Sequence, residues 1–217
     1  MGQYQAVIFD LDGTLLDTLG DLRASVNYAL AQLGYPARTL DEVRRFVGNG
    51  VGLLVRRAVP AGTPEADAAR CLELFRAHYA DHCRDLTVPY PGIPALLDAL
   101  HAAGVPAAVV SNKFDAAVKE LCAHYFPGRI GAAVGESAEV ARKPAPDAVF
   151  RAAEELGVPL SSMVYVGDSD VDIQTAKNAG VPCISVTWGF RDRAFLEQAG
   201  GTVFADAPTD ILPLLGL

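Results

Sequence analysis

Two aspartates near the N-terminus have the type and spacing that phosphoryl chemistry needs. Asp10 and Asp12 follow the apolar run 6–9, and Gly13 comes directly after them. Side chains two residues apart on an extended segment point to the same side, and a glycine lets the backbone turn sharply. One carboxylate can therefore attack phosphorus while the other handles the proton of the leaving group.

A hydroxyl, an amide and two lysines could hold the oxygens of a phosphoryl group. Ser111, Asn112 and Lys113 follow an apolar run that begins at residue 105, and Lys143 precedes a helical stretch. Hydroxyl and amide side chains can donate hydrogen bonds to phosphoryl oxygens. Taken alone, each residue also fits a plainer role, because serine and asparagine often begin loops and lysines are often solvated.

A second acidic pair stands where a helix is expected to begin near Ser169. Asp168 would precede this helix and Asp172 would lie one turn inside it, so both can face one point beside the positive end of the helix. Carboxylate oxygens suit Mg²⁺, a hard cation that keeps several of its waters. The pair therefore predicts a magnesium site.

The elements that must position these groups alternate between short apolar runs and amphipathic stretches. Strands alternating with helices predict a parallel sheet covered on both faces, with catalytic groups at the carboxyl ends of the strands. Residues 18–86 break this rhythm, because they offer only helical periodicities. We expect an all-helical insert there, and a core domain made of residues 1–17 and 87–217.

Composition narrows the class of partner. The chain of 217 residues carries 18 Lys and Arg against 26 Asp and Glu, a formal net charge of −8. This balance disfavours nucleic acid and anionic membranes, which attract clustered positive charge. No basic leader with an apolar core and no apolar run of membrane-spanning length is present. We expect a cytoplasmic protein, monomer or homodimer, that acts on a small phosphorylated metabolite.

Four motifs, which contain Asp10, Ser111, Lys143 and Asp168 in chain order, together resemble those of haloacid-dehalogenase-superfamily phosphatases. The resemblance runs from Ala6 to about Phe204. It implies an α/β fold with a doubly wound, Rossmann-like parallel sheet and an inserted helical cap. It also implies that Asp10 is the nucleophile, which becomes an aspartyl-phosphate, and that Asp12 is first a general acid and then a base.

The same resemblance assigns the other groups. Ser111 and Lys143 match the residues that hold the phosphoryl oxygens. The implied Mg²⁺ ligands are Asp10, the backbone carbonyl of Asp12, and Asp168, with Asp172 as an outer acid of the metal site. The substrate-binding set that we predict consists of Gly13, Thr14, Asn49, Gly50, Arg57, Asn112 and Lys113.

The need for a cation also follows from charge. Four carboxylates and one ammonium group, that of Lys143, leave the predicted site at −3, and Mg²⁺ would bring it to −1. Crowding of the carboxylates could also keep Asp12 protonated and ready to donate to a leaving oxygen.

The segment Val47–Val59 resembles the cap of phosphoglycolate phosphatases, and Arg57 or its neighbour Arg56 could bind a small carboxylate. 2-Phosphoglycolate is therefore the substrate that we expect first. Inorganic pyrophosphatases and broad-specificity sugar or nucleotide phosphatases share much of the pattern. A different class, the non-catalytic phosphoaspartate switch, combines similar residues, but it needs neither a second acid nor a lid.

Overall fold

The computed structural model describes residues 4–48 and 50–217, and it divides the chain into two compact units. Asp17–Val88 form one unit, and the remainder of the chain forms the other. The insert expected from the sequence, 18–86, ends two residues earlier and begins one residue later than this unit.

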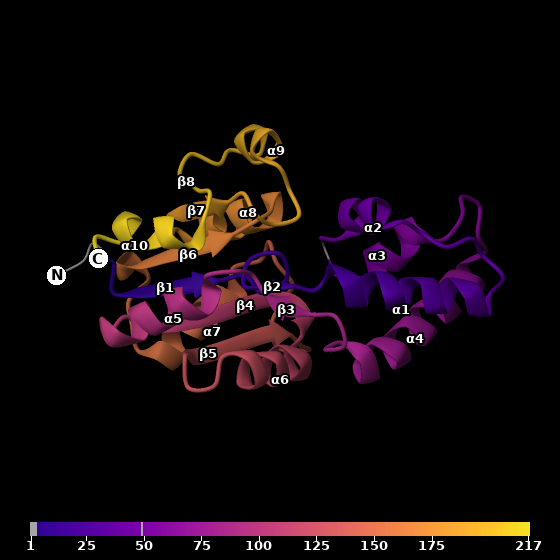
Figure 1. Ribbon diagram of the computed structural model, residues 1–217, viewed down its shortest axis with the longest axis horizontal. Helices are drawn as coiled ribbons and strands as arrows, with labels where there is room; N and C mark the ends of the chain where they lie inside the picture. Colours follow the sequence, from indigo (N-terminus) through magenta and orange to yellow (C-terminus); the bar gives the residue numbers. More distant parts are fainter. Residues whose placement is uncertain (1–3, 49) are drawn as a thin grey trace. The chain divides into compact units, whose positions relative to one another are not determined.

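The larger unit is built on a six-stranded sheet in which every described neighbour pair is parallel (Figure 1). Parallel strands buried on both faces read as near-continuous apolar runs, and the residues of the first strand are fully buried. In spatial order the strands are β5 (Ile130–Glu136), β4 (Ala107–Phe114), β1 (Ala6–Phe9), β6 (Met163–Gly167), β7 (Cys183–Val186) and β8 (Phe204–Ala205).

The strand order reverses direction at β1. After β1 the chain adds β4 and β5 on one side, and it then returns to add β6, β7 and β8 on the other. Ligands of open α/β sheets bind outside the carboxyl ends of the strands at such a reversal point. Asp10, directly after β1, is therefore placed where this topology favours a site.

Helices cover the sheet. α7 and α8 pack on one face through a cluster of small and branched residues that includes Ile8, Val110 and Val149. α5 packs on β4 and α10, and α6 lies against β4 and β5. The helices of this unit are α5 (Ile93–Ala102), α6 (Asp115–Tyr125), α7 (Asp147–Leu156), α8 (Asp170–Ala179), α9 (Arg193–Gln198) and α10 (Ile211–Leu214), with two 3₁₀ turns at Leu160–Ser162 and Pro208–Asp210.

The doubly wound parallel sheet predicted from the sequence is confirmed, with differences in detail. The strand expected over 105–110 runs instead from Ala107 to Phe114, so Ser111 and its two successors lie inside β4 rather than after it. β5 and the two-residue β8 were not among the predicted strands. The β5 sequence, IGAAVGE, offers few β-branched or large apolar residues.

The smaller unit is helical. α1 and α4 pack against each other, and α2 and α3 complete the unit. Thr39 and Glu42 form a capping box at the start of α2. Its helices are α1 (Leu19–Gln32), α2 (Leu40–Phe46), α3 (Val51–Ala58) and α4 (Glu65–His82). The chain enters and leaves this unit through two paired two-residue strands, β2 (Leu16–Asp17) and β3 (Val88–Pro89).

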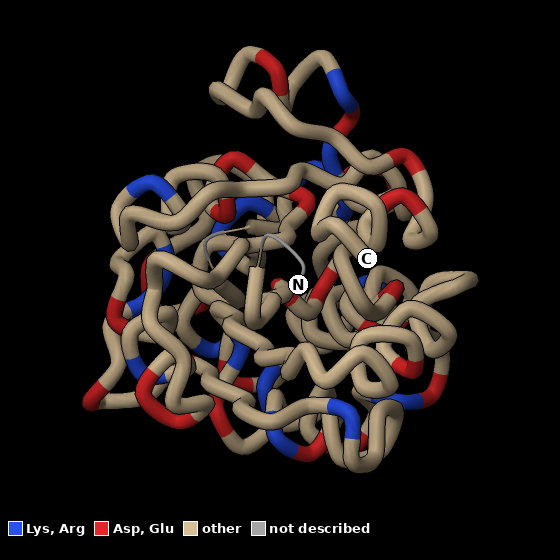
Figure 2. Tube along the Cα trace, turned by 90° about the vertical axis from the view of Figure 1, so that its left-hand side faces the viewer, with Lys and Arg blue, Asp and Glu red and all other residues tan. Residues whose placement is uncertain are grey.

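Charged residues of both signs are interspersed along the Cα trace (Figure 2). Among the described residues, no helix combines the length and the apolarity that crossing a lipid bilayer requires.

Candidate active site

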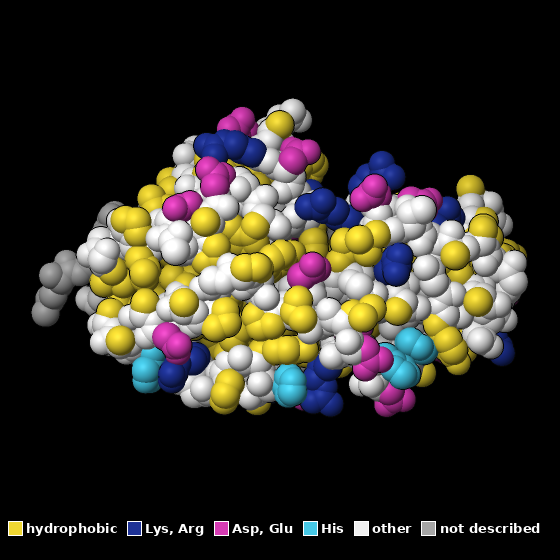
Figure 3. All heavy atoms as spheres, in the orientation of Figure 1, with side chains coloured by type: hydrophobic (Ala, Val, Ile, Leu, Met, Phe, Trp, Pro, Cys, Tyr) yellow, Lys and Arg dark blue, Asp and Glu magenta, His cyan; other side chains and the backbone are white. Residues whose placement is uncertain are grey.

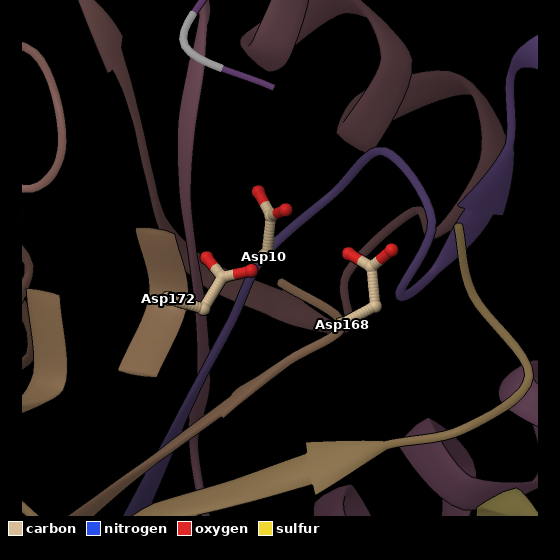
Figure 4. A group of neighbouring side chains, drawn as sticks. All are labelled: Asp10, Asp168 and Asp172. Atoms are coloured by element: carbon tan, nitrogen blue, oxygen red, sulfur yellow. The ribbon is translucent and has the colours of Figure 1, made fainter. Parts of the chain in front are cut away.

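Three acidic side chains converge at the carboxyl ends of β1 and β6. Asp10 follows β1, and its N–H donates to Val166 O at 2.9 Å, which ties the two strand ends together. Asp168 follows β6 and Asp172 lies in the first turn of α8. One oxygen from each of the three carboxylates lies within 4.8 Å of the others, and all three side chains are buried (Figure 4).

Lys143 brings a positive charge into contact with two of these acids. Its Nζ lies 2.8 Å from Asp10 Oδ1 and 2.8 Å from Asp172 Oδ1. It also donates to Val110 O at 3.2 Å and to Tyr165 Oη at 3.1 Å. The ammonium group is therefore held between the predicted nucleophile and an acid of α8.

Asp172 is fixed by the way that α8 begins. Ser169 is the N-cap, and the two residues form a capping box in which Ser169 N and Oγ donate to Asp172 Oδ2 at 3.1 and 2.5 Å. Gly167 leaves room for this carboxylate, because a Cβ there would lie 2.4 Å from Asp172 Cγ. The oxygen that the cap does not use, Oδ1, points to Lys143.

Asp168 is held by groups from two distant loops. Thr14 Oγ1 donates to Asp168 Oδ1 at 3.4 Å, and Phe190 N donates to Oδ2 at 2.7 Å. Gly13 has φ of +92°, and a Cβ on it would lie 2.4 Å from Asp168 Oδ2. A Cβ on Gly189 would lie 2.3 Å from Asp168 Cβ. Both glycines therefore allow the backbone to approach this carboxylate closely.

Lys113 contacts the second aspartate of the first motif. Its Nζ lies 3.1 Å from Asp12 Oδ1, in an ion pair whose geometry is not that of a hydrogen bond, and Lys113 is buried. Ser111 is buried nearby and its Oγ accepts from Lys113 N at 3.3 Å. The structure therefore adds a second positive charge to the site, so the count of −3 made with Lys143 alone becomes −2.

The side-chain amide of Asn112 forms two hydrogen bonds with the backbone of Lys143. Its Nδ2 donates to Lys143 O at 3.1 Å and its Oδ1 accepts from Lys143 N at 2.7 Å. The amide thus fixes the loop that carries the lysine, a positioning contact that the sequence pattern did not indicate.

The predicted substrate-binding residues of the helical unit can be described only within that unit. Gly50 is the N-cap of α3, and Arg57 Nη1 donates to Phe46 O at 2.9 Å. Arg56 forms an ion pair with Glu65. Asn49 lies outside the described residues.

The pKa values of two of the acids are raised, first by burial and then by the crowding of negative charge. Burial raises the pKa of Asp10 well above its ordinary value, the Asp172 carboxylate raises it further, and Lys143 opposes both. Burial, followed by the Asp172 carboxylate, raises the pKa of Asp168 to about 7. Burial alone would lower the pKa of Lys143, but Asp10 and Asp172 raise it well above the usual range.

These residues fit a hard divalent cation. The donors are carboxylate oxygens close enough to share one ion, and their mutual repulsion is what an added positive charge relieves. Four carboxylates meet two ammonium groups, so a divalent cation would bring the formal charge of the cluster to zero.

Two aromatic residues of the site were not predicted. Tyr165 is fully buried in β6 and its hydroxyl contacts Lys143, yet its position in an apolar strand looks like ordinary core. Trp188 Nε1 donates to Thr14 O at 3.0 Å and so ties the loop after β7 to the turn after β1. The sequence shows a tryptophan after a strand, but nothing in it indicates this partner.

Comparison with known proteins decides the family. A model of the haloacid dehalogenase-like hydrolases matches residues 7–186. The chain belongs to that family. Two phosphoglycolate phosphatases are similar to it within the family: that of Pseudomonas syringae pv. tomato is 40% identical over 92% of this chain and 76% of its own length, and that of Neisseria meningitidis is 39% identical over 91% and 86%.

Solved structures of the family agree. A protein from Lactobacillus delbrueckii subsp. bulgaricus, described as a candidate phosphoglycolate phosphatase, superposes with a TM-score of 0.94 at 40% identity, over 100% of both chains. The resemblance to phosphatases of the haloacid dehalogenase family, predicted from the motifs, is confirmed, as is the enzyme class, a phosphoric monoester hydrolase.

Proposed function

We propose that this protein is a Mg²⁺-dependent phosphatase that hydrolyses a small phosphate monoester through an aspartyl-phosphate on Asp10. The observation that carries the proposal is the convergence of one lysine and three buried acids at the carboxyl ends of β1 and β6. Such a set combines a nucleophile, a fixed positive charge and oxygen ligands, which are the parts that phosphoryl transfer requires.

In the first half of the reaction, a carboxylate oxygen of Asp10 attacks phosphorus and the bond from phosphorus to the ester oxygen breaks. Asp12, acting as the general acid, gives a proton to the departing oxygen, so that an alcohol leaves. Lys143, 2.8 Å from Asp10, stabilises the charge on the transferring oxygens, with Ser111 as a second donor.

In the second half, water attacks the phosphorus of the aspartyl-phosphate. Asp12 now takes the proton of that water, and the bond between phosphorus and the Asp10 oxygen breaks. Inorganic phosphate leaves, Asp10 is restored as a carboxylate, and Asp12 is again protonated. Every proton and oxygen of the hydrolysis is then accounted for.

The ligands that we propose for Mg²⁺ are the carboxylates of Asp10 and Asp168 and the backbone carbonyl of Asp12, with Asp172 as the outer acid. When bound, the ion offsets the charge that the phosphate dianion would otherwise meet. Hydrogen bonds from Thr14 Oγ1 and Phe190 N orient Asp168, and one from Ser169 Oγ orients Asp172.

The substrate that we propose first is 2-phosphoglycolate, and the proposed partner is accordingly a small phosphorylated metabolite. Relatives at 35–40% identity bear the name phosphoglycolate phosphatase. Arg57 supports a carboxylated substrate, because its guanidinium donates to a neutral group, the backbone carbonyl of Phe46, whereas Arg56 is neutralised by Glu65. Pyrophosphate, sugar phosphates and nucleotides are the alternative substrates.

One assay tests the proposal. Phosphate release is measured with 2-phosphoglycolate, pyrophosphate, sugar phosphates and nucleotides, with Mg²⁺ and with EDTA. We expect sustained, Mg²⁺-dependent turnover that is fastest with 2-phosphoglycolate. Unchanged turnover in EDTA would contradict the metal requirement, and a single equivalent of phosphate per protein would favour a phosphoaspartate switch instead.

A further inference from the structure

A buried hydroxyl joins the lysine of the site to the acid at the start of α8. Tyr165 is fully buried in β6, and its side chain belongs to the apolar cluster beneath α7 and α8. Its Oη lies 3.1 Å from Lys143 Nζ and 3.0 Å from Asp172 Oδ1. The ring thus extends through the core and ends at two charged groups of the site.

The hydrogen-bond inventory of Lys143 gives this hydroxyl a distinct role. An ammonium group has three donors, and Nζ has four oxygen neighbours, those of Asp10, Asp172, Val110 and Tyr165, between 2.8 and 3.2 Å. Of these four, only the hydroxyl can accept and donate at once. It can accept from Lys143 and donate to Asp172 Oδ1, so it links the two opposite charges.

The hydroxyl of Tyr165 can restrict the position of the Lys143 ammonium group. Its charge stands at the end of a flexible four-carbon stem, whereas an aromatic ring locked in a core can hold its hydroxyl at one point. Asp172 is fixed through its other oxygen by Ser169. Tyr165 and Asp172 together therefore form a rigid frame around the ammonium group.

We propose that Tyr165 is a positioning residue that holds the Lys143 ammonium beside Asp10 for phosphoryl transfer. This inference rests on the proposed function. Since Lys143 acts mainly on charge that develops as the phosphoryl group transfers, loss of its alignment should lower kcat more than it raises KM.

The first test is Tyr165→Phe, which removes the hydroxyl and keeps the ring. We expect kcat for both 2-phosphoglycolate and p-nitrophenyl phosphate to fall about tenfold, with KM changed less than about threefold. The matched control is Tyr79→Phe, which removes a hydroxyl from a buried tyrosine of the helical unit and should keep kcat within about twofold. A wild-type kcat in Tyr165→Phe would overturn the inference.

The second test asks whether Tyr165 acts through Lys143. In a Lys143→Ala background, Tyr165→Phe should lower kcat less than about twofold, because the group that it positions is gone. A tenfold loss in both backgrounds would mean that the hydroxyl acts independently, which would overturn the inference.

Unfolding experiments separate failure of this inference from failure of the proposed function. Urea denaturation of the wild type, the two single variants and the double variant measures the coupling between Tyr165 and Lys143 without any turnover. Strong coupling with an unchanged kcat in Tyr165→Phe leaves the phosphatase assignment standing and overturns the positioning role. If the wild type releases no phosphate from any monoester, the proposed function itself fails.

Discussion

Asp10 is the residue on which the proposed chemistry depends most directly, because the covalent bond to phosphorus forms on its carboxylate. Asp10→Asn keeps the size of the side chain and removes the nucleophilic charge. We expect phosphate release to fall by at least about 10³-fold, with the circular dichroism spectrum of the folded protein retained. Activity within tenfold of the wild type would contradict the assignment.

Substitution of Gly189 tests whether the position of the Asp168 side chain matters for Mg²⁺ binding. A Cβ at this position would lie 2.3 Å from Asp168 Cβ and 2.5 Å from Gly13 O, a backbone atom that cannot easily move. Gly189→Ala should therefore displace Asp168, and we expect the Mg²⁺ concentration for half-maximal activity to rise at least about tenfold.

A suitable control for this substitution is Gly52→Ala in α3, where the nearest atom to an added Cβ is 4.0 Å away. It should leave the Mg²⁺ requirement unchanged and stabilise the helix by about 0.5–1 kcal/mol. Equal Mg²⁺ requirements in the two variants would argue against Asp168 as a ligand.

Arg57 tests the recognition of a carboxylate. Arg57→Ala should raise KM for 2-phosphoglycolate more than KM for p-nitrophenyl phosphate, which has no carboxylate, by a factor of about ten. Arg56→Ala is the matched control, because that guanidinium already has a carboxylate partner in Glu65. Equal effects of Arg57→Ala on both substrates would remove its role in recognition.

Among single residues, the sequence predicted the site groups that are charged and that stand next to a predicted strand or helix. Asp10, Lys143, Asp168 and Asp172 could be proposed together because each follows or precedes a recognisable element. Tyr165 could not, since an aromatic residue in a buried strand looks the same whether or not its hydroxyl reaches a charged group. The difference lies in a contact across the fold, which spacing along the chain does not encode.

Among the elements, α1 and the segment that leaves the helical unit are joined by one carboxylate. Asp21 is buried in the first turn of α1, and it accepts from Leu86 N at 2.9 Å, Thr87 N at 2.8 Å and Thr87 Oγ1 at 2.7 Å. Asp21→Ala removes the acceptor that these donors share and leaves a cavity. We expect a loss of about 3 kcal/mol in the free energy of unfolding, measured by urea denaturation.

An exposed acid in the first turn of another helix provides the comparison. Asp41 lies in the first turn of α2, and Asp41→Ala should cost no more than about 1 kcal/mol through the helix dipole. If both substitutions cost the same, Asp21 does not fasten the exit segment to α1.

The elements that the sequence predicted are those with unbroken patterns. β1 was expected over its full length because its four residues are apolar and are followed by an acid. β5 was missed because glycine and alanine dominate it, and only pairing with β4 and cover from α6 make this segment a strand. Tertiary packing, rather than intrinsic propensity, decides such cases.

On the scale of the whole molecule, negative charge exceeds positive charge by eight, yet the surface mixes both signs, as the face in Figure 3 shows. Exposed pairs such as Arg151–Glu155 and Arg193–Glu197 contribute little to stability individually. The buried acids of the site are different, because solvent screens them poorly and their repulsion persists in the folded state.

This difference predicts that a divalent cation stabilises the fold specifically. Mg²⁺ at about 100 times its dissociation constant should add about 2.7 kcal/mol to the free energy of unfolding and raise Tm by about 5–10 °C, as measured by thermal denaturation. NaCl at the same ionic strength is the control, since it screens surface charge without entering the site, and it should give a much smaller shift. Asp168→Asn should abolish the Mg²⁺-specific part of the shift, because it removes a ligand and relieves the repulsion that the ion offsets. A shift of equal size with NaCl, or an undiminished one in Asp168→Asn, would mean that Mg²⁺ acts on the surface and that the three acids do not form its site.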